Sequence, residues 1–308
     1  MPVRRSYRRP PSSRGRRKTY RRRATTRRTP RRTRRSYRKR TMSVRRILNH
    51  TSQKKSDTMP CWTNIDVADP SGNAEVYTNG SAQFPGVAPD FRSFYLTVFC
   101  PTARTAEDLD GVQGTKAMTQ VRTNTTCFAR GYREVSELST TTGVGWQWRR
   151  ICFTMKGDTL SEGVTDPETS RLFRETSNGY MRLVTILTNN RAQDILFKGE
   201  QNVDWTDPIT APIDTRRVSL KFDQTRVIKS NNASGTTKVY KDWFPMNKNI
   251  YYEDEERGSV MNESPFSVEN KQGMGDYYIC DIFQSNRGAT SADDLTFNPQ
   301  GRYYWHEK

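Results

Sequence analysis

The chain has 308 residues, and its 51 Lys and Arg against 33 Asp and Glu give a formal net charge of +18. Residues 1–56 hold 24 basic residues and no acidic one, which leaves 51 − 24 = 27 basic and 33 acidic residues, a net charge of −6, in residues 57–308. This division excludes a uniformly basic protein and indicates a polyanionic partner for the N-terminal segment. Neither a membrane-spanning apolar run nor the apolar segment of a signal peptide occurs, so we expect neither membrane insertion nor secretion.

Residues 1–56 are predicted to form a basic arm. Almost nothing apolar interrupts the arginines of residues 1–40, so this part cannot bury enough surface to offset its ordering entropy, and we expect it to be disordered when free. A few apolar residues appear between Thr41 and Leu48. They indicate either a short helix or a strand where the arm joins the body, and the sequence does not choose between the two.

Residues 57–308 alternate short apolar runs with clusters of Gly, Asn, Asp, Pro, Ser and Thr, which is typical of strands joined by loops. Together, two weaker candidates and seven runs rich in β-branched or aromatic residues predict eight or nine strands. The seven runs are residues 93–100, 146–155, 182–188, 218–223, 237–244, 277–283 and 302–306, and the weaker candidates are residues 61–67 and 195–197.

The clearest alternation of apolar and polar residues lies at residues 218–223, where Val218, Leu220 and Phe222 are expected to face a core. Helical signals are confined to residues 166–175, which open with Asp-Pro-Glu, and to a single turn at residues 105–109. Long helices do not alternate with the strands, so a parallel α/β fold is disfavoured. We predict a single all-β domain over residues 57–308, an antiparallel sandwich or jelly roll with long loops.

Inventory of reactive residues argues against an enzyme. Only His50 and His306 are present, so a metal site built on a His-x-His pair is excluded, and a triad would have to use one of these two residues. A phosphate-binding loop is also missing, because Gly114-Thr115-Lys116 has the wrong order. We therefore expect no catalytic residues, no metal and no cofactor.

Three further groups of residues have structural interpretations, and two of these groups keep an alternative. The run Glu253-Asp254-Glu255-Glu256 is expected to be a solvated loop, and the alternative is a divalent-cation site at a subunit junction. Five cysteines without a C-x-x-C pair, Cys61, Cys100, Cys127, Cys152 and Cys280, are expected to be buried and reduced. The tryptophans in strand-like runs, Trp146, Trp148, Trp243 and Trp305, are expected in the core, with anchors between subunits as the alternative.

The arm carries the strongest functional signal. Arg holds phosphate oxygens bidentately and stacks on bases, so the arm is predicted to bind nucleic acid with steep salt dependence and little sequence preference. Tyr7, Tyr20 and Tyr37 either stack on unpaired bases or are incidental, and the Arg runs can also serve as nuclear import signals. The predicted nucleic-acid-binding residues are Arg4, Arg5, Arg8, Arg9, Arg14, Arg16, Arg17, Lys18, Arg21, Arg22, Arg23, Arg27, Arg28, Arg31, Arg32, Arg34, Arg35, Arg38, Lys39 and Arg40.

Three segments resemble the capsid proteins of genomoviruses, which are small circular single-stranded DNA viruses. They are residues 42–62 (MSVRRILNHTSQKKSDTMPCW), 145–157 (GWQWRRICFTMKG) and 298–308 (NPQGRYYWHEK). More distantly, the layout is similar to geminivirus and circovirus capsid proteins. The resemblance implies a single eight-stranded jelly roll, a small T=1 icosahedral shell, and arms that line its interior on the genome.

The predicted function is therefore a homo-oligomeric capsid protein that packages single-stranded DNA, located in the virion and, during assembly, in the host nucleus after binding an import receptor. With about 60 copies, the arms would supply about 60 × 24 = 1,440 positive charges against the phosphates of the genome. The alternative is a monomeric nucleic-acid-binding protein of ribosomal or chromatin type, which the negative body disfavours.

Overall fold

The computed structural model describes residues 42–72, 76–88, 94–107, 111–156, 160, 172–187, 191–258, 260–262 and 264–308. The chain divides into two units, Met1–Ser43 and Val44–Lys308, and every helix and strand named below belongs to the second unit. Its first strand, β1 (Gln53–Met59), crosses position 56/57, where the charge composition changes.

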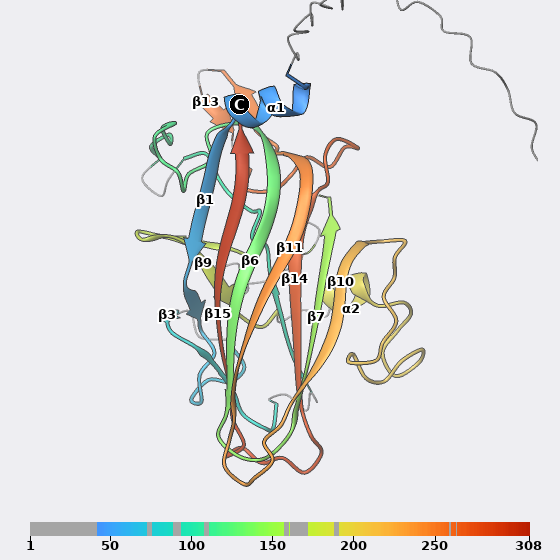
Figure 1. The fold of residues 1–308 in the computed structure, drawn as a ribbon. Coiled ribbons are helices and arrows are strands. Elements are labelled where there is room, and N and C mark those ends of the chain that lie inside the picture. The colour runs from blue at the N-terminus through green and yellow to red at the C-terminus, as the bar shows by residue number, and fades with distance from the viewer. Residues whose placement is uncertain are drawn as a thin grey trace, which may run out of the picture. The chain divides into compact units, whose positions relative to one another are not determined.

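Eight strands, together with the short strand β4 (Ala82–Phe84), build two antiparallel sheets of five and four strands (Figure 1). The first sheet has the order β1, β15 (Leu295–Glu307), β6 (Thr126–Thr140) and β11 (Thr237–Tyr251), and β4 also pairs with β15. The second sheet has the order β10 (Ser219–Ile228), β7 (Trp146–Met155), β14 (Asp276–Ser285) and β5 (Tyr95–Phe99).

The pairing of these eight strands is nested along the chain. The first pairs with the last (β1 with β15), the second with the seventh (β5 with β14), the third with the sixth (β6 with β11) and the fourth with the fifth (β7 with β10). Such nesting arises when one long antiparallel hairpin is folded over on itself into two sheets, which is the jelly roll. The predicted all-β, antiparallel jelly-roll fold is thereby confirmed.

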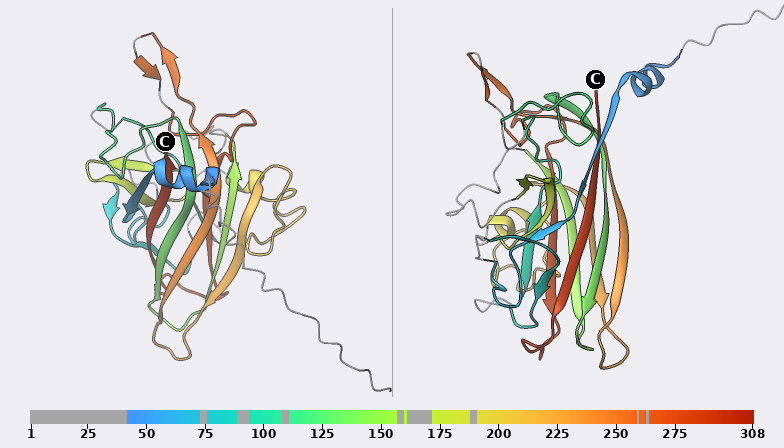
Figure 2. Two further views of the ribbon diagram at one scale, coloured as in Figure 1. Left: turned by 45° about the horizontal axis from the view of Figure 1, so that its top comes forward. Right: turned by 90° about the vertical axis from the view of Figure 1, so that its left-hand side faces the viewer.

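Short elements decorate the two sheets. Strands β3 (Thr78–Asn79), β2 (Cys61–Thr63), β9 (Gly179–Val184) and β8 (Arg174–Thr176) form a further small sheet, in which β2 and β9 run parallel. Strands β12 (Glu255–Arg257) and β13 (Val260–Asn262) form a hairpin that projects beyond the ends of the long strands in both views of Figure 2. Helices α1 (Val44–Thr51) and α2 (Arg191–Leu196) complete the described elements. None of the described helices has the length and apolar character needed to cross a membrane.

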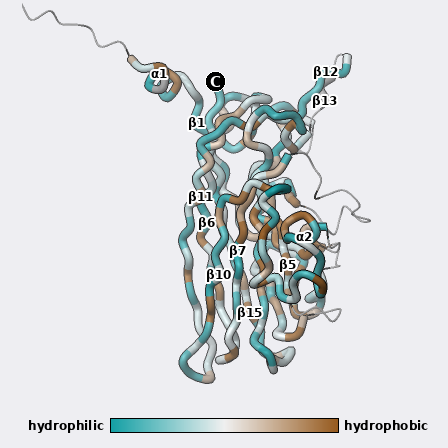
Figure 3. The backbone as a smooth tube through the Cα atoms, turned by 90° about the vertical axis from the view of Figure 1, so that its right-hand side faces the viewer, coloured by the Kyte–Doolittle hydropathy of each residue, from teal (hydrophilic) through white to brown (hydrophobic). Residues whose placement is uncertain are grey.

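The core lies between the two sheets because long strands alternate inward and outward side chains. In β15, for example, Leu295, Phe297, Tyr303 and Trp305 are buried, whereas Arg302 is exposed. Figure 3 shows that the turns at the lower end of the strands are mostly hydrophilic. The apolar side chains therefore gather along the strands, where they can pack between the two sheets.

Most of the strands predicted from apolar runs are present, with bounds that differ by a few residues. The exception is the weaker candidate at residues 195–197, because Ile195 and Leu196 belong to helix α2. A short apolar run buried on several sides has no period that distinguishes a helix from a strand. Residues 44–51 form helix α1, which settles the choice left open at the junction with the arm.

Two predicted helical segments are not helical where the structure describes them. Residues 174–176 form strand β8, and Glu107 forms an isolated β-bridge with Gln113. The remaining parts, residues 166–171 and 108–109, lie outside the described residues. A capping signal without a following apolar period is therefore a weak predictor of a helix.

Side-chain orientation departed from prediction at two residues. Leu220 is 38% exposed because a β-bulge between Leu220 and Phe222 shifts the alternation that was expected to bury it. Trp146, Trp148 and Trp305 are buried in the core as predicted, but Trp243 is 47% exposed.

Candidate nucleic-acid interface

The twenty basic residues predicted to bind nucleic acid all lie within residues 1–40, outside the described residues, and so do Tyr7, Tyr20 and Tyr37. Their role stays a prediction. Two of the 24 basic residues counted in residues 1–56 belong to strand β1, where they have different environments. Lys54 is exposed, whereas Lys55 is buried and its Nζ lies 3.1 Å from a carboxylate oxygen of Glu307. The charge of Lys55 is therefore neutralised within the fold.

A second basic surface lies on the first sheet. We define the basic sheet face as the side chains of β1, β15, β6 and β11 that point away from the second sheet. Its exposed basic residues are Lys54, Arg130, Arg133, Lys241 and Arg302, and its only exposed carboxylate among the described residues of these strands is Glu137. This face is thus strongly positive although residues 57–308 carry a net charge of −6.

Two arginines of this face lie directly opposite each other. The backbone register pairs Arg302 of β15 with Arg133 of β6, and Arg133 in turn with Trp243 of β11. Arg302 donates a hydrogen bond to Ser56 Oγ (2.9 Å), and neither arginine forms an ion pair within the described part of the chain. Like charges at opposed positions of a sheet are destabilising, so the fold tolerates a local repulsion here.

Aromatic rings are interleaved with these charges. The rings of Trp243 and Tyr304 meet edge to face, with centroids 5.7 Å apart, and the Arg302 guanidinium lies 5.2 Å from the centroid of Tyr304. The Trp243 indole lies over Gly131, whose φ is 155°. A Cβ at residue 131 would come within 2.6 Å of the indole and 2.7 Å of the Phe244 carbonyl oxygen, so only glycine allows this ring to lie against β6.

The potential of the face also acts on His306, which packs near Phe128 with ring centroids 6.1 Å apart. Partial burial, together with the charges of Lys54 and Arg130, lowers the pKa of His306 below its ordinary value of 6.5. The imidazole is therefore neutral at pH 7, and the positive charge of this face comes from Lys and Arg alone.

A pocket of about 410 Å³ forms another basic surface, at the ends of β7 and β10 beside β11. Its lining includes Lys156, Arg217, Lys221 and Lys248 and no carboxylate. Partial burial and the neighbouring charge of Lys248 lower the pKa of Lys221. No aromatic residue lines this pocket, which distinguishes it from the basic sheet face.

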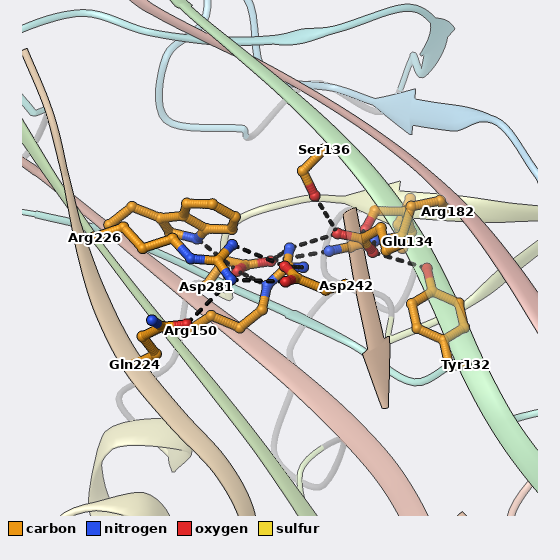
Figure 4. A network of polar contacts seen from close by, with 11 residues as sticks. Tyr132, Glu134, Ser136, Arg150, Arg182, Gln224, Arg226, Asp242 and Asp281 are labelled. Carbon is orange, nitrogen blue, oxygen red and sulfur yellow. Dashed lines mark hydrogen bonds and ion pairs between the residues drawn. The ribbon is translucent and has the colours of Figure 1, made fainter. Parts of the chain in front are cut away.

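Beneath the basic sheet face, the interior of the jelly roll contains a network of ion pairs (Figure 4). Arg150 binds Glu134 (2.5 Å) and Asp281 (2.6 Å), and Arg182 binds the same two carboxylates (2.8 and 2.9 Å). These four side chains are buried and come from β7, β6, β14 and β9, so the network joins the two sheets and the small sheet.

Neutral groups and a more accessible ion pair complete this network. Tyr132 and Ser136 donate hydrogen bonds to Glu134, and the Trp148 indole donates one to Asp281 (2.8 Å). Arg226 and Asp242 form a further ion pair at its edge, with a nearest distance of 2.7 Å. Three arginines thus face three carboxylates, which leaves no net charge.

This balance governs the ionisation of the network. Burial by itself would raise the pKa of Glu134, but the charges of Arg150 and Arg182 outweigh it and hold that pKa well below the ordinary value. Burial by itself would lower the pKa of Arg182, but the charge of Glu134 outweighs burial and raises that pKa above the ordinary range. Glu134 and Arg182 are therefore charged at neutral pH, and the network serves as a structural crosslink of the sheets.

The four acidic residues at positions 253–256 differ in burial and in their partners. Asp254 is buried in a bidentate pair with Arg122 (2.6 and 3.0 Å), whose guanidinium lies 4.0 Å from the centroid of Tyr252. Glu253, Glu255 and Glu256 are exposed, as expected of solvated side chains, but Glu255 and Glu256 lie in strand β12 and not in the predicted loop. Within the described residues no three His, Cys, Asp or Glu side chains come together as a metal site.

The five cysteines are buried and unpaired, as predicted. Burial raises the pKa of Cys61 to about 12, and it raises the pKa of the other four thiols above the ordinary value as well. Thiols with such pKa values are protonated at neutral pH and are poor nucleophiles.

Strand β6 was not predicted from the sequence, so Arg130 and Arg133 of the basic sheet face were not found. In that strand the inward positions include Glu134 and Ser136, so a search for apolar alternation does not find it. Burial alternates regularly from Tyr132 to Leu138, but the inward and the outward positions each mix polar with apolar residues, so the sequence carries no period-two signal for this strand.

No protein-family model and no curated protein sequence matches the chain. Among solved structures it is similar to VP1 of trichodysplasia spinulosa-associated polyomavirus bound to GM1 oligosaccharide, with a TM-score of 0.12, 10% identity, and coverage of 82% of this chain and 93% of that one. A mutant of the unassembled Washington University polyomavirus VP1 pentamer has a TM-score of 0.10 and 7% identity, with coverage of 84% and 94%. These neighbours are viral capsid proteins of β fold, and at such low scores the fold assignment rests on the strand pairing described above.

Proposed function

We propose that this chain is a capsid protein that self-assembles into a small icosahedral shell and packages circular single-stranded DNA, as its resemblance to genomovirus capsid proteins implies. The observation that carries the proposal is the joining of two features in one chain. One is the nested jelly-roll pairing of eight strands, and the other is an N-terminal segment with 24 basic residues and no acidic one. A closed assembly of such bodies gathers many arms around one polyanion.

The role is non-enzymatic. The described body places its five thiols in the interior with raised pKa values, and its two histidines have other surroundings: His306 packs on Phe128 and His50 lies in the last turn of helix α1. The buried side chains of Glu134, Arg150, Arg182 and Asp281 are engaged in ion pairs that bind the sheets to one another. Chemistry by an activated nucleophile has no support in this arrangement.

The arm supplies DNA binding and nuclear entry in this proposal. Its Arg runs, such as Arg21-Arg22-Arg23, neutralise phosphates without reading bases and also match the composition of import signals. The genome is therefore held by charge, and the shell by contacts between bodies.

Electron microscopy and sedimentation of the full-length protein, with and without circular single-stranded DNA, test the proposal. Uniform closed particles that protect the DNA from nuclease are expected. A protein that stays monomeric with DNA would refute assembly and would favour a monomeric nucleic-acid-binding protein.

A charge variant separates packaging from assembly. Replacing the arginines of residues 21–23 and 31–35 with Gln should lower DNA affinity and reduce its dependence on salt, by about 0.7 in logarithmic slope for each phosphate that is no longer neutralised. Exposed Arg216 and Arg257 of the body, which lie outside the basic sheet face and the basic pocket, provide the control when they are replaced in the same way. If the control variant loses as much DNA binding as the arm variant, the arm is not the packaging element.

A further inference from the structure

We infer that the basic sheet face is a second nucleic-acid contact, on which Trp243 and Tyr304 stack with unpaired bases while Arg133, Arg302 and Lys241 hold the adjoining phosphates. The inference rests on the proposed binding of single-stranded DNA and adds to it a contact that depends on bases. The arm, by contrast, binds phosphates.

The exposure and the fixed position of Trp243 suit base stacking. Nearly half of the Trp243 side chain, 47%, is open to solvent, whereas Trp146, Trp148 and Trp305 are almost completely buried. The indole is nevertheless positioned by its neighbours, because Gly131 lies beneath the ring and Tyr304 meets it edge to face. A fixed, exposed aromatic plane is what a base requires for stacking, since little side-chain entropy remains to be lost on binding.

The positive charges around Trp243 suit phosphate binding. Arg302 and Arg133 are opposed across two strands without an ion-pair partner in the described residues, and Lys241 lies on the next strand two positions before Trp243. This repulsion would be relieved by a bound anion. A phosphate between the strands would take two guanidinium groups in the bidentate geometry that arginine favours.

The aromatic rings and the positive charges of the basic sheet face together indicate which kind of molecule binds there. A second copy of the same face is disfavoured, because it would bring Arg133 and Arg302 against their own counterparts. A double-stranded nucleic acid offers phosphates but no free base plane along its side. Single-stranded nucleic acid offers both, and alternation of stacking rings and cations is the usual construction of surfaces that bind it.

The test compares two probes of equal length on the full-length protein: an oligothymidylate, and an abasic oligonucleotide with the same number of phosphates. Affinities are measured over a series of salt concentrations. The charges of the arm contribute equally to both probes, because the probes carry the same charge, and any stacking by Tyr7, Tyr20 or Tyr37 is the same in the wild type and in variants of the body. The wild-type protein should prefer oligothymidylate by about five- to 150-fold for each stacked base.

Two variants on the same strand separate the contributions. Trp243→Ala should remove most of the preference for the base-containing probe and leave the affinity for the abasic probe unchanged. Lys241→Gln should weaken both probes equally and reduce the salt slope by about 0.7. Trp243→Phe should retain part of the preference, and circular dichroism checks that all variants stay folded.

The outcomes distinguish this inference from the proposed function. Equal affinity of the wild type for both probes, or a preference that persists in Trp243→Ala, would overturn the inference while leaving arm-mediated packaging intact. Failure of the full-length protein to bind either probe at low salt would refute the proposed function itself. If Trp243→Ala blocks particle formation without changing the preference for bases, the face contacts another copy, and the inference is wrong.

Discussion

Glu134 offers the sharpest test of the buried network, because four groups converge on its carboxylate. Ser136 and Arg150 bind Oε1 (2.7 and 2.5 Å), and Tyr132 and Arg182 bind Oε2 (both 2.8 Å). In Glu134→Gln, an amide NH2 group, which can only donate, replaces one of these two oxygens. The hydroxyl of Ser136 or Tyr132 can rotate to accept from this NH2 group, but a guanidinium, which can only donate, then faces another donor whichever way the amide is oriented.

The expected magnitude follows from this geometry. The three arginines of the network are balanced by three carboxylates, so the variant leaves one buried positive charge without compensation. Removing one partner of a buried pair costs about 3 to 5 kcal/mol, a large part of the roughly 5 to 15 kcal/mol that stabilises a typical domain. For a slope of about 3 kcal/mol per molar urea, the unfolding midpoint should fall by about 1 to 2 M.

Urea titration of unassembled protein, followed by tryptophan fluorescence at one fixed concentration, measures this change, since assembly would add stability that depends on concentration. Arg216→Gln, at an exposed ion pair with Asp214, is the control and should leave the midpoint unchanged. Because the pKa of Glu134 is held below its ordinary value of 4.5, its contribution is present above pH 4.5 and declines as the pH falls further. A fall of less than about 1 kcal/mol at pH 7 would show that the network does not depend on its charges.

Three further changes test other parts of the interior. Burial raises the pKa of Asp276 from 3.8 to about 7, so the free energy of unfolding of the wild type should fall by about 4 kcal/mol as the pH rises from 3.8 to about 7. In urea titrations, Asp276→Asn should make the free energy of unfolding nearly independent of pH over this interval. The same pH dependence in the variant as in the wild type would contradict this prediction. Gly301→Ala would place a Cβ against the Tyr132 hydroxyl and should lower the free energy of unfolding by about 1 to 3 kcal/mol, measured by thermal or urea unfolding. Gly80→Ala is the neutral control, because the space around Gly80 is open. All five thiols should resist a disulfide reagent at pH 8 in the native state and react in urea; rapid labelling of Cys61 without urea would show that its surroundings open.

The described strands show which signals in the sequence were sufficient. Residues 146–155 and 277–283 are rich in β-branched and aromatic side chains, and both became central strands of the second sheet. Strand β6 was not found, although it is 15 residues long, because Glu134 and Ser136 occupy inward positions. A charged residue can face the interior only when partners from other strands neutralise it, and those partners are distant in the sequence.

The candidate interface shows the same limit. Composition alone revealed the basic arm, whose residues lie outside the described structure. The surface around Trp243 depends on register, since Arg133, Arg302 and Tyr304 come from two strands that are more than 150 residues apart in the chain and yet lie side by side. Trp243 lies in an alternating run that suits burial as well as exposure, and nothing local in the sequence indicates which side faces the core.

The sequence by itself determined the division into a basic arm and an acidic body, the all-β class and the absence of common catalytic motifs, because these follow from composition and local periodicity. Only the tertiary structure decided the nested strand order, the burial of Glu134, Arg150, Arg182 and Asp281 as one neutral network, and the exposure of Trp243 over Gly131. These properties depend on which distant strands pair and in what register, and a shift of one residue in that register would turn each of these side chains to the opposite face.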